Sequence, residues 1–152
     1  MTSSYYLVFT LDDQSYALCL EAVERVVRMV QLTLVPEAFD ILSGLINVRG
    51  TVVPVLDIRK RFRLPPREVE IQDRMIVSKT SSRSIAIIVD RIEGLFEFDP
   101  DEMREAGEIL TDMEGRVEGI GISGDHTVLI YDINKLFSIN DIDRLNIDAR
   151  ST

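Results

Sequence analysis

The sequence predicts an all-β protein made of two similar small barrels that share one core, with a few short helical turns. Short runs rich in β-branched and aromatic residues recur along the chain, turn-forming residues separate them, and the pattern repeats weakly between the two halves. The 152 residues are 45% apolar and 28% charged, the balance of an ordinary folded domain. At this length about 70% of the unfolded chain's surface can be buried without a disulfide or a metal.

The first half alternates strand-like runs with turns. Its expected strands are 5–11, 16–20, 23–30, 44–48 and 51–56. A short helix is expected over 36–42, because proline suits the first position of a helix. The last two strands meet at Arg49-Gly50, where glycine allows a tight corner. Asp57 is the expected N-cap of a helical turn over 58–62.

The second half reads in the same way. Its expected strands are 75–78, a long run over 85–98, and the hairpin strands 117–122 and 127–131. Asp99-Pro100 is a helix-start signal, residues 105–116 have the acidic composition of a loop, and Asp132 is the expected cap of a final turn through Phe137. The polar tail 140–152 is expected to form at most a short amphipathic helix.

An internal repeat unites these elements. Residues 44–62 align without a gap on 119–137, which places Asp57 on Asp132, and 17–24 align on 86–93. About five strands per half make closure into a barrel the stable solution, because closure removes sheet edges. We therefore expect one domain over 1–152, with barrel halves at approximately 15–70 and 71–140 and with the N-terminal strand and C-terminal tail packing across them. The repeat also shows that the second hairpin closes without an arginine, which indicates that Arg49 does more than complete the fold.

Charge and composition exclude several classes of function. A net charge of −9, from 26 acidic and 17 basic residues, argues against general binding to nucleic acid or to anionic membranes. The basic cluster over 59–63 with Arg67 is better explained as a solvated helix face than as a phosphate site, because no Gly-rich loop accompanies it. Cys19 is the only cysteine and is expected to be buried and inert. No signal peptide and no apolar run of about 20 residues is present, so we expect a cytoplasmic protein without membrane insertion.

No catalytic constellation stands out either. His126 lies beside a turn without a triad partner, and serines 81, 82 and 84 flank a turn where serine is common. The acids Asp99, Asp101, Glu102 and Asp112 lack the spacing of a calcium loop, and a glycosidase-like carboxylate pair has no positive support. We expect a protein that is not an enzyme, has no cofactor and no metal, and acts through its surface.

The segment GLINVRGTVVPVLDIRKRF (44–62) closely resembles the signature of the CheW family of chemotaxis coupling proteins, an Asn-x-Arg-Gly corner followed by an apolar strand that ends in Pro and Asp. Segments 5–27, 83–103 and 119–137 resemble the same family, so the resemblance covers about 5–138. It implies two SH3-like five-stranded barrels. It also implies a non-catalytic adaptor that couples the cytoplasmic tips of methyl-accepting chemoreceptors to a CheA-type histidine kinase in membrane receptor arrays.

The resemblance also implies two sets of binding residues. Val23, Val26, Val27, Asn47, Arg49 and Gly50 fall on the family's receptor-binding region. Arg83, Ser84 and Ile85 fall where the second barrel meets the kinase.

One position departs from the family's usual pattern. The family often has Arg or Gln followed by Glu on the third strand, whereas this chain has Glu24 followed by Arg25. If the usual Glu pairs with the corner arginine, Arg25 would stand near Arg49 with like charge. A solvated surface exchange, worth about 0–1 kcal/mol, and an altered partner specificity both remain open. The second would fit an adaptor for a specialised receptor–kinase pathway, such as biofilm formation or surface motility.

Overall fold

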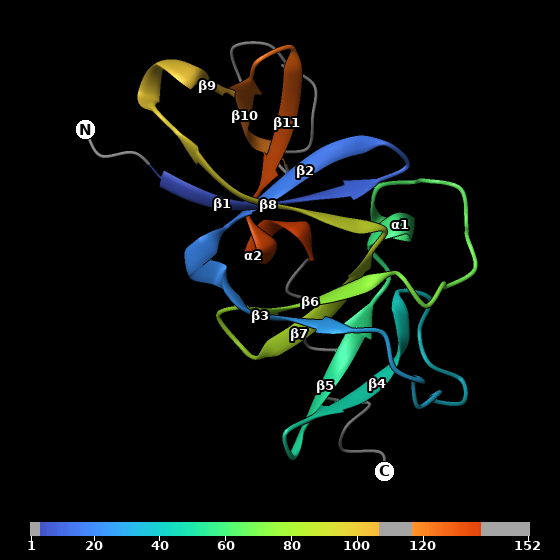
Figure 1. Cartoon of the computed structure of the whole chain (residues 1–152). Coiled ribbons are helices and arrows are strands. Elements are labelled where there is room, and N and C mark those ends of the chain that lie inside the picture. Colours follow the sequence, from blue (N-terminus) through green and yellow to red (C-terminus); the bar gives the residue numbers. More distant parts are fainter. Residues whose placement is uncertain (1–3, 107–116, 138–152) are drawn as a thin grey trace.

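The computed structural model describes residues 4–106 and 117–137, which form two β-sheets joined by short helical turns (Figure 1). Sheet A has the order β8-β1-β2-β11-β10-β9, and sheet B has the order β3-β6-β7-β5-β4. The strands of sheet A are β1 (Ser4–Leu11), β2 (Gln14–Cys19), β8 (Arg91–Phe98), β9 (Met103–Glu105), β10 (Val117–Ser123) and β11 (His126–Tyr131). The strands of sheet B are β3 (Val23–Arg28), β4 (Leu42–Val48), β5 (Thr51–Leu56), β6 (Arg74–Lys79) and β7 (Ser84–Val89). The expected all-β fold with two subdomains is confirmed.

The helical segments are single turns. They are α1 (Ile58–Arg61), α2 (Ile133–Leu136), η1 (Leu20–Ala22) and η2 (Pro100–Glu102). The Asp57 and Asp132 side chains cap α1 and α2 as expected, accepting hydrogen bonds from the Lys60 and Asn134 backbone N–H groups. The helix expected over 36–42 is wrong: this stretch consists of turns and irregular chain up to Leu42, where β4 begins, and Glu37 has φ of 59°, which a helix does not tolerate.

The long strand expected over 85–98 divides at Asp90. Before Asp90 the chain forms β7 in sheet B, and after it the chain forms β8, which pairs with β1 in sheet A. Each sheet therefore receives one end of a nearly continuous β-run. This connection ties the two subdomains together through a single residue.

The internal repeat is present in three dimensions, strand by strand. The order β8-β1-β2-β11-β10 corresponds to β3-β6-β7-β5-β4, and each series contains one parallel pair. In those pairs Ile130 lies opposite Ala17 and Val55 lies opposite Ala86, which are equivalent positions in the sequence repeat. β9 adds a sixth strand to sheet A beyond the five that were expected. In sheet B, Thr33 and Leu45 exchange two backbone hydrogen bonds of 2.8 and 2.9 Å, which brings the chain after β3 against β4.

The sheets exchange their first hairpins. β1 and β2 come from the first repeat but lie in sheet A with the strands of the second, and β6 and β7 come from the second repeat but lie in sheet B. The expected halves 15–70 and 71–140 thus follow the sequence repeat and not the sheets. The C-terminal tail, which was expected to pack across the halves, lies outside the described residues.

A shared core joins the two sheets. It combines side chains from sheet A, such as Phe9 and Leu18, with side chains from sheet B, such as Ile76 and Ile87. The α2 turn lies between the sheets in Figure 1 and adds Ile133 and Leu136 to this core. Each sheet also has a smaller cluster of its own. None of the helices in the described parts of the chain is long and apolar enough to span a membrane.

Candidate docking surfaces

The β4–β5 corner is a tight two-residue turn. Val48 pairs with Thr51, and the intervening Arg49 and Gly50 have φ of 51° and 87°, the signs that a type I′ turn requires at both central residues. The Asn47 side-chain oxygen accepts a hydrogen bond of 2.7 Å from the Gly50 N–H. Asn47 and Gly50 therefore shape the turn, and both are exposed.

Arg49 occupies a backbone conformation that suits it poorly. Left-handed φ costs a side chain about 1–2 kcal/mol, and Asn, Asp or Gly is preferred at this turn position. The equivalent residue of the second repeat is Gly124, with φ of 60°. The Arg49 side chain is exposed, and no hydrogen bond or ion pair holds it among the described residues. The strained conformation of Arg49 thus has no compensating side-chain contact among the described residues.

β3 presents the three predicted valines in different ways. Val26 is 40% exposed and lies opposite Ile76, on the face of sheet B that looks toward the shared core. Val27 lies opposite Met75 and packs on the separate cluster of sheet B. Val23 is half-buried against the shared core. Of the three, only Val26 is exposed and available to a partner, while the other two support the strand.

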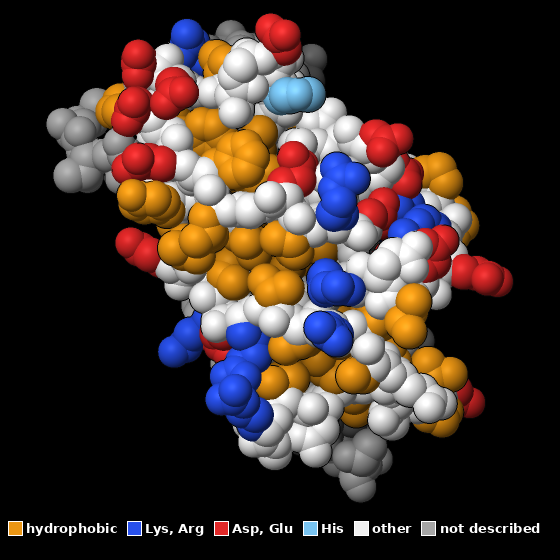
Figure 2. All heavy atoms as spheres, in the orientation of Figure 1, with side chains coloured by type: hydrophobic (Ala, Val, Ile, Leu, Met, Phe, Trp, Pro, Cys, Tyr) orange, Lys and Arg blue, Asp and Glu red, His pale blue; other side chains and the backbone are white. Residues whose placement is uncertain are grey.

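The repeat places a second exposed apolar residue at the position equivalent to Val26. Leu95 on β8 is 58% exposed and lies opposite Leu7, just as Val26 lies opposite Ile76. β3 and β8 are each an end strand of their sheet. The residues opposite Val26 and Leu95, which are Ile76 and Leu7, belong to the shared core. Tyr5 and Leu20 are also exposed, and we refer to these four exposed apolar residues together as the apolar band. Figure 2 shows apolar side chains gathered across this face, where β8, η1 and β3 lie.

The predicted kinase-binding residues differ in accessibility. Ile85 is fully buried in the shared core, so its side chain can only support the strand. The Ser84 hydroxyl donates a hydrogen bond of 2.5 Å to the Glu24 carboxylate. Arg83 is half-buried in the β6–β7 turn, where its backbone N–H and carbonyl both bond to the Thr80 side chain. Ser84 of the predicted kinase set thus contacts Glu24, a neighbour of the predicted Val23 on β3.

The unusual Glu24–Arg25 order has a structural explanation. Glu24 is the extra residue of a β-bulge, since Val23 pairs with Ser78 and Arg25 with Val77. The equivalent Glu93 is bypassed in the same way in the pairing of β8 with β1, and its carboxylate accepts a hydrogen bond of 2.5 Å from Ser15. A bulged glutamate bound to a serine is therefore a repeated element of the fold.

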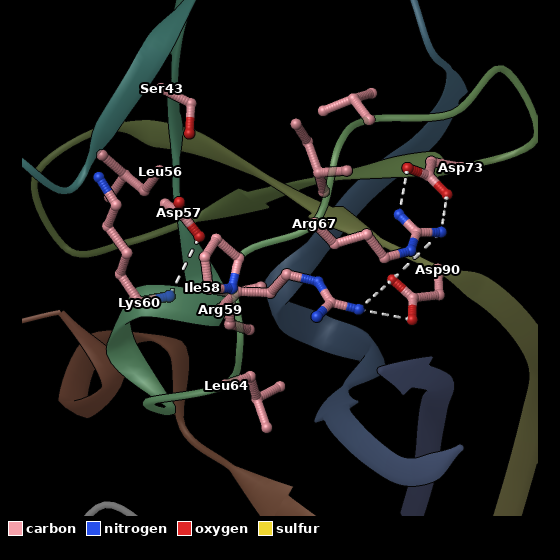
Figure 3. A pocket seen from close by; sticks show the side chains of 13 residues that line it. Ser43, Leu56, Asp57, Ile58, Arg59, Lys60, Leu64, Arg67, Asp73 and Asp90 are labelled. Atoms are coloured by element: carbon pink, nitrogen blue, oxygen red, sulfur yellow. Dashed lines mark hydrogen bonds and ion pairs between the residues drawn. The ribbon is translucent and has the colours of Figure 1, made fainter. Parts of the chain in front are cut away.

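The basic cluster after β5 is not the solvated face that the sequence indicated. Arg59 donates hydrogen bonds of 2.7 Å to Asp12 and of 2.8 and 2.9 Å to Asp90. Arg67 binds Asp73 through two hydrogen bonds of 2.8 and 2.9 Å. Figure 3 shows both arginines beside Asp90 at the edge of a hollow of about 190 Å³. The expectation fails because α1 places Arg59 against Asp12 and Asp90, and the connector between α1 and β6 folds back so that Arg67 meets Asp73.

The pairing also sets the protonation of this ion-pair cluster. Burial opposes ionisation of Asp73, but hydrogen bonds from Arg67 and from the Glu70 N–H outweigh it and lower the pKa of Asp73 below its ordinary value. The hydrogen bond to Asp73 raises the pKa of Arg67. The hydrogen bond from Arg59 likewise lowers the pKa of Asp12. The ion pair of Arg67 with Asp73 is therefore charged at neutral pH and holds the connector in place.

The remaining residues singled out in the sequence have simple positions. His126 is exposed at the start of β11, and Glu102 and Asp99 form the capping box of η2. Asp112 lies outside the described residues. Cys19, which was expected to be buried, is half-buried and lines a second hollow.

Comparison with known proteins identifies the family. The CheW-like domain matches residues 5–140. The chain belongs to the CheW-like family. This CheW-like chain is 30% identical to the chemotaxis protein CheW of Bacillus subtilis over 146 residues, covering 92% of the chain and 85% of that protein. It is 25% identical to the chemotaxis protein CheW of Klebsiella aerogenes over 147 residues, covering 96% and 89%.

A solved structure agrees with this assignment. The crystal structure of the scaffolding protein TtCheW from Thermoanaerobacter tengcongensis superposes with a TM-score of 0.82 at 28% identity, covering 92% of this CheW-like chain and 96% of that one. Sequence reasoning named Val26 but missed Leu95, Leu20 and Tyr5. Extending the repeat by two residues past Glu24 and Glu93 would have placed Leu95 on Val26.

Proposed function

We propose that this CheW-like chain is a non-catalytic adaptor that couples chemoreceptors to a CheA-type histidine kinase in chemotaxis. The observation that carries the proposal is the pair of exposed apolar residues, Val26 and Leu95, at equivalent positions of the two sheets. Membership of a family whose solved member is a scaffolding protein supports it. Exposed apolar residues together with an arginine are a usual composition of protein-binding surfaces.

The receptor contact is assigned to the apolar band and the β4–β5 corner. Val26 and Arg49 supply side chains for direct contact, because both are exposed. Asn47 and Gly50 act by fixing the turn that carries Arg49. Val23 and Val27 act from below by holding β3 on its clusters. The receptor segment would be the cytoplasmic tip of a methyl-accepting chemoreceptor, which recruits the adaptor from the cytoplasm to membrane arrays.

The kinase contact is assigned to the β6–β7 turn. Arg83 would contact the kinase, while Ser84 and Ile85 position the turn through the Glu24 contact and the shared core. Because Ser84 binds a residue of β3, the receptor and kinase surfaces are mechanically adjacent. This adjacency suits a protein that must hold two partners at once.

The test separates the two contacts. Arg49→Glu is expected to weaken binding to a purified receptor cytoplasmic fragment without changing the thermal midpoint of unfolding. Arg83→Glu is expected to weaken binding to the kinase while receptor binding persists. Arg28→Glu, an exposed charge reversal near the end of β3, is the matched control. Normal receptor binding by Arg49→Glu at an unchanged midpoint would remove the corner from the site.

The alternative, an adaptor for a specialised pathway in biofilm formation or surface motility, was motivated by the Glu24–Arg25 order. The bulge and its Ser84 hydrogen bond account for that order within the fold. No observation among the described residues favours the alternative. Capture of a kinase other than a CheA-type enzyme by the tagged protein would revive it.

A further inference from the structure

The internal repeat produces two equivalent hollows, one beside each capped turn. The hollow at α1 is lined by Ile58, Ile88 and Asp90, and the hollow at α2 is lined by the equivalent residues Ile133, Cys19 and Glu21. The two hollows are therefore built from equivalent residues. Differences between their lining residues show which groups are present at one hollow and missing at the other.

The hollow at α1 is occupied by the chain's own connector. Leu64, Pro66 and Val69 line it from the connector side, and Arg67 brings its guanidinium to 3.7 Å from the Asp90 carboxylate. Arg59 also binds Asp90 and donates a hydrogen bond of 3.0 Å to the Pro65 carbonyl. Figure 3 shows Leu64, Arg59 and Arg67 around the space that remains, about 190 Å³. A stretch of leucine, prolines and arginine thus covers part of this site.

The hollow at α2 has an equivalent wall, but its described lining residues include no connector segment like the one at α1. Its volume is about 490 Å³, against about 190 Å³ at α1. Its wall is apolar at Tyr6, Met103 and Ile133, and a β-sheet floor lies beneath at Ile130.

Among the described residues, the α2 hollow lacks the arginines that neutralise the acidic side chain in the α1 hollow. Glu21, the equivalent of Asp90, is exposed and has no hydrogen bond or ion pair within the described parts of the chain. The residue equivalent to Arg59 is Asn134, which carries no positive charge. Its side-chain oxygen accepts a hydrogen bond from the Ser81 N–H. Glu118 and Asp132 add two more carboxylates, and Lys79 is the one cation among the lining residues that the structure describes. The site is net acidic, so a cationic group would complement it.

We propose that the α2 hollow is a docking groove for an extended segment of a partner protein that carries an apolar residue, proline and an arginine. The apolar residue and proline pack on Tyr6, Met103 and Ile133, and the arginine pairs with Glu21 as Arg67 and Arg59 pair with Asp90. A proline-containing segment is already extended and loses little conformational entropy on binding. This site adjoins the two contacts assigned above without using their residues: Glu21 follows Leu20 of the apolar band, and Asn134 accepts a hydrogen bond from the Ser81 N–H of the β6–β7 turn.

The chain supplies both the probe and the reporter for a test. The probe is a synthetic peptide with the sequence of residues 63–70, Arg-Leu-Pro-Pro-Arg-Glu-Val-Glu. The reporter is Cys19, the only cysteine of the chain, which lines the groove and whose reaction with a thiol-specific chromogenic reagent can be timed. The covalently attached connector already occupies the α1 hollow at high effective concentration, so the free peptide competes poorly there.

We expect saturating peptide to slow modification of Cys19 in the full chain at least about fivefold. Glu21→Lys should abolish this protection, and a peptide with Ala in place of Arg67 should protect at least about fivefold more weakly at equal concentration. Glu37→Lys makes the same charge change at an exposed position that does not line the groove and should leave protection intact. Far-UV circular dichroism of both variants establishes that they are folded.

Three outcomes would overturn the proposal. The first is Cys19 modification that peptide does not slow in the folded protein. The second is protection that Glu21→Lys leaves unchanged, which places the peptide elsewhere. The third is modification that is already slow without peptide and faster in Glu21→Lys alone, which would mean that this chain or a second copy already fills the groove. Receptor and kinase binding by Glu21→Lys stay normal if the adaptor function and this groove are independent.

Discussion

Removing the Arg67 side chain should destabilise the protein by about 2–3 kcal/mol. Asp73 is 0% exposed, and Arg67→Ala would leave its carboxylate with the Glu70 N–H as a remaining donor, 2.9 Å away. Breaking a buried ion pair typically costs about 3–5 kcal/mol. The Arg67 side chain is itself 27% exposed, so water can enter the vacated space and lower that cost.

Urea unfolding at pH 7, monitored by circular dichroism, measures the change in the free energy of unfolding. In a thermal melt of the same variant the midpoint should fall by about 5–10 °C, because 1 kcal/mol corresponds to about 2–4 °C for a protein of this size. Arg28→Ala removes an exposed arginine that has no partner among the described residues, and it should change stability by less than about 0.5 kcal/mol. An Arg67→Ala effect as small as that of Arg28→Ala would refute the role assigned to the ion pair.

The same pair predicts a pH dependence. The pKa of Asp73 is lowered in the folded protein, so its stabilisation is complete above the ordinary carboxyl pKa of about 4 and is lost as pH falls through the lowered value. The stability difference between the natural protein and Arg67→Ala should therefore be constant from pH 7 to pH 5 and should shrink below about pH 4. A difference that persists unchanged at pH 2.5 would contradict this account.

Three further perturbations test other parts of the molecule. Arg49→Gly relieves left-handed strain at φ of 51° and should raise the free energy of unfolding by about 1 kcal/mol while weakening receptor binding in a pull-down. Val26→Asp and Leu95→Asp should each reduce receptor-dependent kinase stimulation with little change in the urea midpoint, and a loss in only one of them would show that the band is one-sided. Gly121→Ala places a Cβ 2.8 Å from the Phe98 ring and should cost about 1–3 kcal/mol in thermal unfolding, whereas normal stability would show that the ring moves freely.

Most of the fold that could be predicted from the sequence followed from the internal repeat. Local patterns fixed the strands, and the two capping aspartates gave the phase that matches one half to the other. Pairing between distant segments was not predictable, because the exchange of hairpins is decided by which strands bury their faces together and not by any local signal. The division at Asp90 was hidden for the same reason, since β-branched residues continue on both sides of it.

The candidate site was predictable in outline only. The resemblance located the Arg49 corner, but exposure separates Val26, which can touch a partner, from Ile85, which cannot, and exposure depends on tertiary packing. The pairing of Arg59 and Arg67 with three carboxylates likewise depends on a connector whose sequence, rich in proline and charge, gave no sign of where it folds. The Glu24 bulge was visible in the alignment with Glu93 but could not be interpreted without the register.

The exchange of hairpins has a consequence for how such a molecule arises and matures. A polypeptide with one repeat alone would leave each sheet short of two strands and could complete them only by trading arms with a second copy. Joining two copies head to tail would turn that intertwined dimer into one chain. The equivalent surfaces of the two repeats could then acquire different residues. On the ribosome, β1 and β2 must wait for β8 and β11 to emerge before sheet A can close, so the N-terminal hairpin is made first and is among the last segments to find its neighbours.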